Sequence, residues 1–213
     1  MLQNQTEEEF ADSRFQVLSE LTRLRQLCCD PALVYENYEG GSAKLDLCIE
    51  LIQSAVESGH KILLFSQFTS MIEILTARLQ EESISYFVLQ GSTKKEQRAQ
   101  MVEQFNRDDT SVFCISLKAG GTGLNLTGAD IVIHYDPWWN VAVENQATDR
   151  AHRIGQKNVV TVYKLIAKGT IEEKIIKLQQ RKKELAEESL SGDEIKTASF
   201  QREELLELLE ERF

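Results

Sequence analysis

The chain has 213 residues, of which 42% are hydrophobic, and it carries a formal net charge of −10 at pH 7. This length allows one core-forming domain with appendages, and the acidity argues against a protein that depends on a basic surface to bind nucleic acid. The apolar runs fall short of the roughly 18 residues of a membrane span, and the polar, acidic amino terminus is unlike a secretory signal.

The negative charge belongs to the two ends of the chain. Residues 1–42 hold eight acidic and three basic residues, residues 186–213 hold nine and three, and residues 43–185 hold 17 and 18. The near-neutral middle allows a nucleic-acid partner without predicting one. We expect a helical lead-in over 1–42, a core domain over 43–185 and an acidic, partly helical extension over 186–213.

The first predicted element is an amphipathic helix at 15–28, followed by a break at Pro31 and a Gly-Gly linker at 40–41. Two more helices are predicted from apolar residues at helical spacing, and their members are Leu45, Cys48, Ile49, Ile52 and Val56, and then Phe68, Met71, Ile72, Leu75 and Leu79. Gly59 is well placed to end the first of these two helices.

Two four-residue stretches, Thr93–Glu96 and Thr170–Glu173, have the form of capping boxes and predict helix starts. The Glu/Leu-rich end of the chain, EELLELLEERF, predicts either a helix docked on this domain or half of an interface with something absent.

Five β-rich apolar runs alternate with these helices: 61–65, 85–89, 112–116, 131–135 and 159–166. Most of them are continuous rather than alternating, which predicts strands buried on both faces of a parallel sheet. The fold class is therefore α/β, a parallel sheet with helices on both faces. The four cysteines show no metal-ligand spacing, so no metal site is predicted, and Cys48 and Cys114 are expected to be buried, reduced thiols.

Ligands of an open α/β sheet gather at the carboxyl ends of its strands, so the loops there are the candidate sites. They are 66–70, 90–98, 117–126 and 136–140. The glycine loop within 117–126 offers backbone N–H groups and a hydroxyl that suit a phosphate. It matches neither a Walker loop nor G-x-G-x-x-G, and a structural turn is the alternative.

Arg150 and Arg153 lie three residues apart, with His152 between them. On a helix this spacing defines one face, so both guanidinium groups are predicted to reach a single anionic target. The alternative is a pair of surface salt bridges. His152 is expected to pack or donate a hydrogen bond rather than to catalyse.

Six stretches, taken in chain order, resemble the second RecA-like lobe of a Swi/Snf-type ATPase. They are KILLFSQF, LQGSTKKEQR, ISLKAGGTGLNL, DPWWN, QATDRAHRIGQ and VVTVYKLIAKGTIEEKI. These proteins are superfamily-two helicase-like motors that translocate on double-stranded DNA. The resemblance covers about residues 15–183, and LTRLRQLCCDPAL is similar to the linker that enters this lobe. One departure is Val141, where the family usually has Pro; Asn140 can still cap the helix.

The resemblance implies that ATP and Mg²⁺ are held mainly by a first lobe, which is also this lobe's partner, and that DNA-bound proteins are candidate further partners. Arg153 would be the arginine finger on the γ-phosphate and Arg150 would hold the phosphates or the cleft beside them. The other implied cleft residues are Gln146, Gln156, Gly121, Thr122 and Gly123. The implied contacts to the double-stranded DNA backbone are Ser66, Gln67, Gly91, Ser92, Thr93, Ser116 and Lys118, which would read no sequence.

The resemblance further implies an ATP hydrolase whose isolated second lobe is inactive, located in a bacterial cytoplasm or a eukaryotic nucleus and not secreted. Lys94, Lys95 and Arg98 either add to the DNA contact or form a solvated helix face. Two rival functions stay open. One is the second lobe of an RNA helicase, against which the motif reads DRAHR rather than HRxGRxxR. The other is a non-catalytic interaction module, against which both arginines and the glycine loop are intact.

Overall fold

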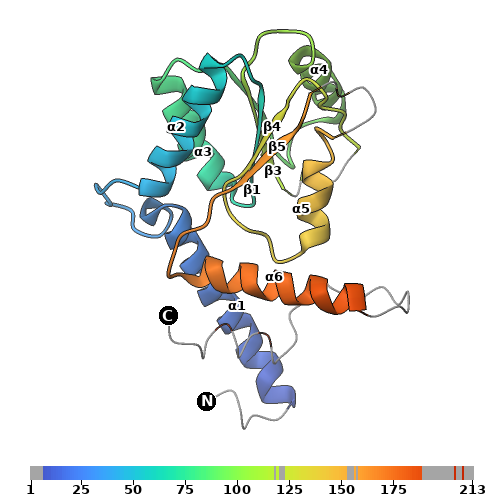
Figure 1. The fold of residues 1–213 in the computed structure, drawn as a ribbon. Coiled ribbons are helices and arrows are strands. Elements are labelled where there is room, and N and C mark those ends of the chain that lie inside the picture. Colours follow the sequence, from blue (N-terminus) through green and yellow to red (C-terminus); the bar gives the residue numbers. More distant parts are fainter. Residues whose placement is uncertain are drawn as a thin grey trace.

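A computed structural model describes residues 7–117, 119, 123–152, 156, 158–188, 204 and 208 of the chain. Its centre is a five-stranded parallel sheet with the strand order β2-β3-β1-β4-β5 (Figure 1). The strands are β1 (Ile62–Ser66), β2 (Tyr86–Leu89), β3 (Val112–Ser116), β4 (Ile131–His134) and β5 (Thr161–Lys164). Each lies inside one of the five predicted runs or extends it by one residue, and the predicted parallel sheet is confirmed.

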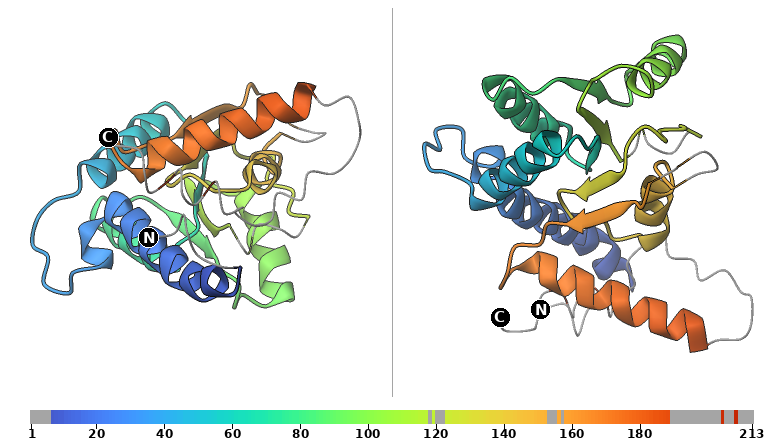
Figure 2. Two further views of the ribbon diagram at one scale, coloured as in Figure 1. Left: turned by 90° about the horizontal axis from the view of Figure 1, so that it is seen from below. Right: turned by 45° about the horizontal axis from the view of Figure 1, so that its top comes forward.

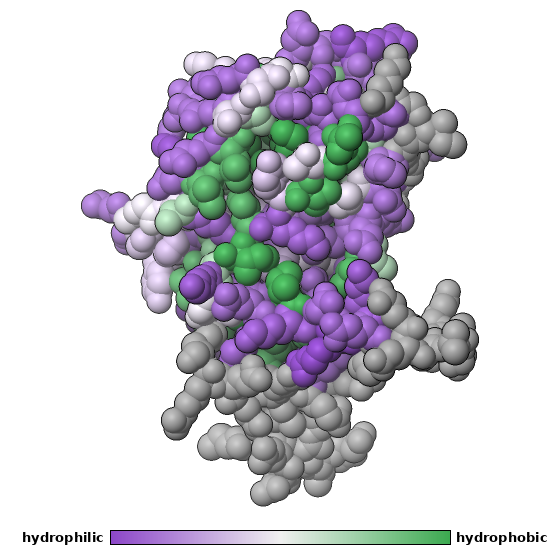
Figure 3. Space-filling view, viewed as in Figure 1, coloured by the Kyte–Doolittle hydropathy of each residue, from purple (hydrophilic) through white to green (hydrophobic). Residues whose placement is uncertain are grey.

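The middle of the sheet is fully buried and its edges are not. Every residue of β1, β3 and β4 is buried, whereas β2 is mostly half-buried and β5 is exposed along its length. Apolar surface gathers between α2 and β5 on the face drawn in Figure 3, and Val162 of β5 is exposed. Burial on both faces, predicted from the continuous apolar runs, therefore holds for the three central strands.

Helices cover both faces of the sheet because successive side chains of a strand point to opposite sides. On one face Ile62 and Leu64 pack against α2 (Ala43–Glu57) and α3 (Thr69–Glu81). On the other face Leu63 and Phe65 pack with Phe105 of α4 (Lys95–Phe105) and Ala147 of α5 (Val141–Thr148). Figures 1 and 2 show this layering.

Two long helices, α1 (Glu7–Cys29) and α6 (Ile171–Glu188), pack on each other below the sheet (Figure 1). Leu21 of α1 is buried against Ile171, Ile175 and Leu178 of α6. Leu208 joins the same cluster, and Glu204 forms an ion pair with Lys182 of α6 at 2.7 Å. At these two described residues, the acidic carboxy-terminal segment is docked on its own domain.

Some of the helix ends that were predicted from local sequence signals are confirmed and one is wrong. Gly59 has a φ of +79° and follows Ser58, the C-cap of α2, and the side chain of Asn140 accepts from the N–H of Ala142, so both predicted ends are confirmed. The capping box at Thr93 is wrong: α4 begins one residue later with Lys94 as N-cap, because the Thr93 hydroxyl accepts from the N–H of Gln90 instead.

The box at Thr170 is present in shifted form. The Thr170 hydroxyl accepts from the N–H of Glu172 at 3.2 Å, and the Glu173 carboxylate accepts from the N–H of Gly169 at 3.0 Å. Both side chains satisfy backbone donors at the start of α6, each one residue from the predicted pairing.

All four cysteines are free, and Cys48 and Cys114 are buried as predicted. Burial raises the pKa of Cys48 to about 12, so this thiol is protonated at physiological pH. No helix within the described part of the chain is both long and apolar enough to span a membrane. Within that same part, no group of three or more His, Cys, Asp or Glu side chains is arranged to hold a metal ion.

His134 generates a prediction on acid stability. It is buried in β4, stacks on Phe65 and shares a hydrogen bond with Thr148 at 2.9 Å. Burial lowers its pKa to about 4, against roughly 6.5 in an unfolded chain. The unfolded chain thus binds the proton more tightly, so stability is full above pH 6.5 and falls by up to ~3 kcal/mol as the pH drops to 4.

We expect His134→Gln to flatten that part of the stability profile, measured as the free energy of unfolding in urea between pH 4 and 7. His152→Gln, which removes an exposed imidazole, is the control and should keep the wild-type slope. An unchanged slope in His134→Gln would contradict the assignment.

Candidate functional site

The carboxyl end of β1 is tied to the loop that follows β4. The Ser66 hydroxyl donates to Asp136 Oδ1 at 2.6 Å, and the N–H of Gln67 lies 3.3 and 3.4 Å from the two carboxylate oxygens. Ser66 is fully buried, so in this conformation its hydroxyl serves Asp136 and faces no solvent. The predicted DNA contact of Ser66 stays a prediction, and the half-buried Gln67 beside it is the more accessible group.

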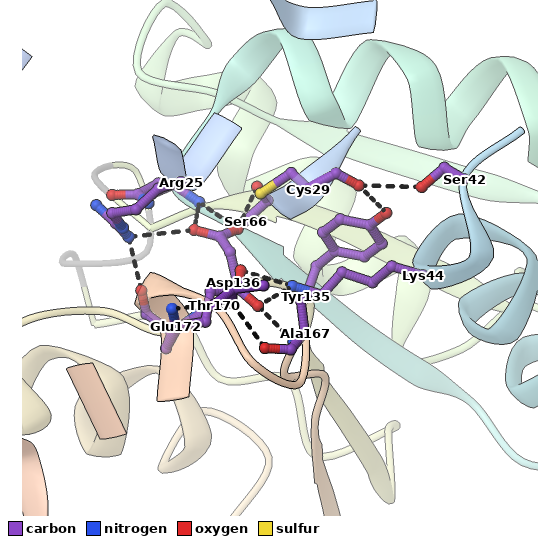
Figure 4. Close-up of polar contacts among 12 residues, drawn as sticks. Arg25, Cys29, Ser42, Lys44, Ser66, Tyr135, Asp136, Ala167, Thr170 and Glu172 are labelled. Carbon is purple, nitrogen blue, oxygen red and sulfur yellow. Dashed lines mark hydrogen bonds and ion pairs between the residues drawn. The ribbon is translucent and has the colours of Figure 1, made fainter. Parts of the chain in front are cut away.

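Asp136 is in turn held by Arg25 of α1 (Figure 4). Arg25 Nη2 lies 3.7 Å from Asp136 Oδ2 and donates to the carbonyl of Pro137 at 2.6 Å, and the guanidinium lies 4.0 Å from the ring centre of Trp139. The two charged side chains are 2% and 1% exposed. The burial raises the pKa of Asp136, although Arg25 acts in the opposite direction.

A second buried network lies beside the first and joins the start of α2 to the start of α6. Lys44 donates to both carboxylate oxygens of Glu172 at 2.7 Å, and Glu172 also accepts from the N–H of Ala167 at 2.7 Å. The Tyr135 hydroxyl donates to the carbonyl of Cys29 at 2.9 Å. Together the two networks fasten α1, α2 and α6 to the carboxyl end of the sheet.

The loop after β2 is shaped by Arg98 of α4. Its Nε donates to the carbonyl of Thr93 at 2.8 Å and its Nη2 to that of Gly91 at 3.0 Å. Arg98 therefore stabilises the loop through these hydrogen bonds, a role that differs from both predicted alternatives, a DNA contact and a solvated helix face. Gly91 and Ser92 are exposed and Thr93 is half-buried, so this loop presents backbone and hydroxyl groups at the surface.

The loop after β3 is described in part. Ser116 is buried at the end of β3, and Gly123 has a φ of +39°, in the left-handed region that glycine adopts without strain. Residues 123–126 are not helical. The predicted roles of Lys118, Gly121 and Thr122 fall on residues outside those the structure describes.

The arginine motif departs from its predicted geometry. Helix α5 ends at Thr148, and Arg150 lies in the turn that follows, with its N–H bonded to the carbonyl of Ala147 at 3.2 Å. Such i to i−3 bonds tighten the chain at a helix end, so the expectation of two arginines on one helix face is wrong at Arg150. Its side chain is 1% exposed, which removes a surface salt bridge as its role. Arg153 lies outside the described residues.

Gln156 and Gln146 differ in their surroundings. The Gln156 side-chain amide donates to the carbonyls of Ala129 and Thr127 at 2.7 and 3.2 Å and to that of Ala151 at 3.3 Å. It therefore fastens the arginine turn to residues 127–129, which follow the glycine loop. Gln146 is exposed on α5 and open to a ligand.

The structure thus brings two pairs of predicted loops together. The N–H of Leu126 donates to the carbonyl of Arg150 at 3.1 Å, and the N–H of Leu117 donates to that of Ser66 at 3.0 Å. The first pair places the glycine loop against the arginine turn, and the second places the loop after β3 against the loop after β1. The loop after β2 stands apart on an edge strand.

Glu144 is a further buried charge that sequence reasoning missed. It is 1% exposed on α5, forms an ion pair with Lys164 of β5 and accepts from the N–H of Trp138 at 3.2 Å. Helix α5 contains no large apolar side chain beyond Val141 and Val143, so no apolar periodicity marks the face of Glu144 as buried. Its role is to fix the 136–140 loop over α5.

The sequence matches the family of the helicase conserved C-terminal domain over residues 43–155. It is 45% identical over 202 residues to an uncharacterized ATP-dependent helicase of Mycoplasma pneumoniae, which covers 93% of this chain and 19% of that protein. It is 44% identical over 169 residues to the chromatin-remodeling ATPase INO80 of Homo sapiens, which covers 79% of this chain and 11% of that protein. The chain thus spans about a fifth or less of these relatives.

Solved structures agree with this result. The SWI2/SNF2 ATPase C-terminal domain of Sulfolobus solfataricus aligns with a TM-score of 0.68 and 35% identity, over 90% of this chain and 80% of that one. The SWI2/SNF2 ATPase core of the same organism, in complex with dsDNA, aligns with a TM-score of 0.70 and 36% identity, over 90% of this chain and 41% of that one.

The Gln156 tether generates a prediction. Gln156→Ala should lower the free energy of unfolding by about 1–3 kcal/mol, because it leaves partly buried carbonyls without donors. Gln146→Ala removes the same side chain from an exposed position and should change stability by less than about 0.5 kcal/mol. Urea denaturation of both variants measures the difference, and equal stabilities would show that the three hydrogen bonds contribute nothing.

Proposed function

Because the chain belongs to the helicase conserved C-terminal domain family, as a carboxy-terminal RecA-like lobe of the Swi/Snf type, we propose that it is the second motor lobe of an ATP-dependent double-stranded DNA translocase. The observation that carries the proposal is the pairing of the glycine loop with the arginine turn. The bond from Leu126 to Arg150 and the Gln156 tether hold the two segments as one unit.

The proposed nucleotide role of this unit follows from its chemistry. Two arginine side chains supply fixed positive charge, and in two-lobed motors such charge stabilises the phosphoryl group as it transfers. In this proposal ATP and its Mg²⁺ are held mainly by another lobe, and Arg153 acts as the finger that reaches the γ-phosphate. The burial of Arg150 supports a role in holding the turn and the cleft, since a buried guanidinium is well oriented.

The proposed DNA role rests on loops that offer hydrogen-bond donors without strong charge. Gly91 and Ser92 are exposed on a braced loop, and Gln67 follows the end of β1. Contacts of this kind position phosphates and carry no sequence information. They also suit the near-neutral middle of the chain, because the grip does not depend on a broad basic surface.

The first prediction from this proposal concerns the 213 residues alone. They should fold and hydrolyse no ATP, because the chain contains no Walker loop to hold the β- and γ-phosphates. The measurement is phosphate release by the purified chain with and without duplex DNA. Steady release that Arg153→Ala abolishes would contradict the proposal.

The second prediction concerns Arg153→Ala in the full-length motor. Nucleotide affinity should stay within a few-fold of wild type, while kcat on duplex DNA should fall by roughly 10³–10⁵. Lysine should restore little of the rate, because one ammonium does not reproduce a planar fork. The measurements are duplex-stimulated ATPase and nucleotide binding on the same preparations.

Arg107→Ala is the matched control, since Arg107 is exposed and paired with Glu103 on the surface. It should leave both values unchanged. A near wild-type kcat in Arg153→Ala would show that this residue is not the finger.

A further inference from the structure

Arg25 grips the 136–139 segment from α1 by three contacts of different kinds. Arg25 Nη2 lies 3.7 Å from the carboxylate of Asp136 and donates a hydrogen bond to the carbonyl of Pro137 at 2.6 Å. The guanidinium also stacks on the ring of Trp139. The hydrogen bond to Pro137 spans 112 positions of sequence. A planar fork that stacks and donates at once fixes both position and orientation, so the loop after β4 and helix α1 move as one body.

Asp136 transmits this constraint to the end of β1 (Figure 4). One carboxylate accepts from the Ser66 hydroxyl and from the N–H of Gln67. The Ser66 oxygen also accepts from the N–H of Phe68 at 3.2 Å. The backbone on both sides of Gln67 is therefore set by a carboxylate whose own position depends on Arg25.

Gln67 itself has a hydrogen-bond donor that nothing in the described part of the chain uses. Its side-chain amide nitrogen is buried and has no partner there. A buried donor without an acceptor is unfavourable, so the half-buried Gln67 side chain would gain a hydrogen bond by turning its amide nitrogen toward a phosphate oxygen. Hydrogen bonds from the N–H groups of Gln67 and Phe68 fix the backbone from which this side chain extends.

We propose that Arg25 and Asp136 are positioning residues that hold Gln67 for a DNA phosphate and make that grip depend on the place of helix α1. The inference rests on the proposed translocase function and deepens it. Helix α1 precedes the sheet in the chain, so a shift of α1 would move Arg25, then Asp136, and then the backbone of Gln67. In this way the segment leading into the lobe controls how the lobe holds DNA.

The ion pair between Arg25 and Asp136 is better suited to positioning Gln67 than to stabilising the fold. Two charges taken out of water lose much of their solvation, and well-packed apolar residues often replace such a pair without loss of stability. A pair with fixed geometry, in contrast, selects one arrangement of the groups around it. An experiment on this pair must therefore separate an effect on the position of Gln67 from an effect on the stability of the fold.

The experiment is a double-mutant cycle between Asp136→Asn and Gln67→Ala in the full-length motor. It measures the duplex concentration that half-saturates the ATPase, with kcat and the melting temperature of each variant. Each single variant should raise the half-saturating concentration on the order of 10-fold, as for a lost hydrogen bond to a charged group. At saturating duplex, kcat should stay within about twofold.

The double variant should be no weaker than Gln67→Ala alone, because Asp136 acts through Gln67. Additive effects on the half-saturating concentration would overturn the proposal, and so would no effect of Asp136→Asn. Arg25→Lys keeps the charge and loses the fork, so it tests the same cycle should Asp136→Asn fold poorly. It should again be non-additive with Gln67→Ala.

Lys61→Met is the matched control for stability. Lys61 lies next to the opposite end of β1 and donates to the carbonyls of Phe105 and Asp108. It should lower the melting temperature and leave the half-saturating duplex concentration unchanged; an increase equal to that of Asp136→Asn would overturn the proposal. A wild-type ATPase indifferent to duplex would instead overturn the proposed function itself, whereas a stimulated wild type with additive variants would overturn the coupling alone.

Discussion

The buried ion pair between Arg25 and Asp136 is the interaction on which the arrangement of the site depends. Two charged side chains, each at most 2% exposed, meet at the carboxyl end of the sheet. The cost of burying them is offset in part by further hydrogen bonds, from Ser66 and Gln67 to the carboxylate and from the guanidinium to the carbonyl of Pro137. The pair therefore requires α1, the end of β1 and the loop after β4 to keep one relative position.

A parallel sheet explains why so few contacts can organise so many loops. The carboxyl ends of all five strands lie at the same end of the sheet, so loops that are distant in sequence are neighbours in space. The backbone bonds from Leu117 to Ser66 and from Leu126 to Arg150 then join them in pairs. Helices α1 and α6 close this edge from below, where Leu21 and Ile175 share one apolar cluster.

The strands and several helix ends could be predicted from the sequence because the signals for them are local. Continuous apolar runs mark strands such as β3 regardless of what lies elsewhere, and Gly59 and Asn140 act on backbone within a few residues. The polar networks were missed because their partners are far apart. Nothing in the spacing of Arg25 and Asp136 shows that they pair.

The errors at Thr93 and Arg150 have a similar cause. The Thr93 hydroxyl had a competing donor, the N–H of Gln90, and took it in place of a helix cap. Helix α5 was expected to continue through Arg150, but i to i−3 bonds tighten the chain at Arg150 and Ala151. Pattern alone does not distinguish a helix from a turn that follows one.

We propose above that this lobe belongs to a motor driven by double-stranded DNA. The most direct measurement is the ATPase rate of the full-length protein with duplex DNA, single-stranded DNA and RNA of equal length, each at saturation. We expect duplex DNA of unrelated sequences to stimulate the rate equally and RNA to stimulate it little. Stimulation by RNA in preference to duplex DNA would contradict the proposal.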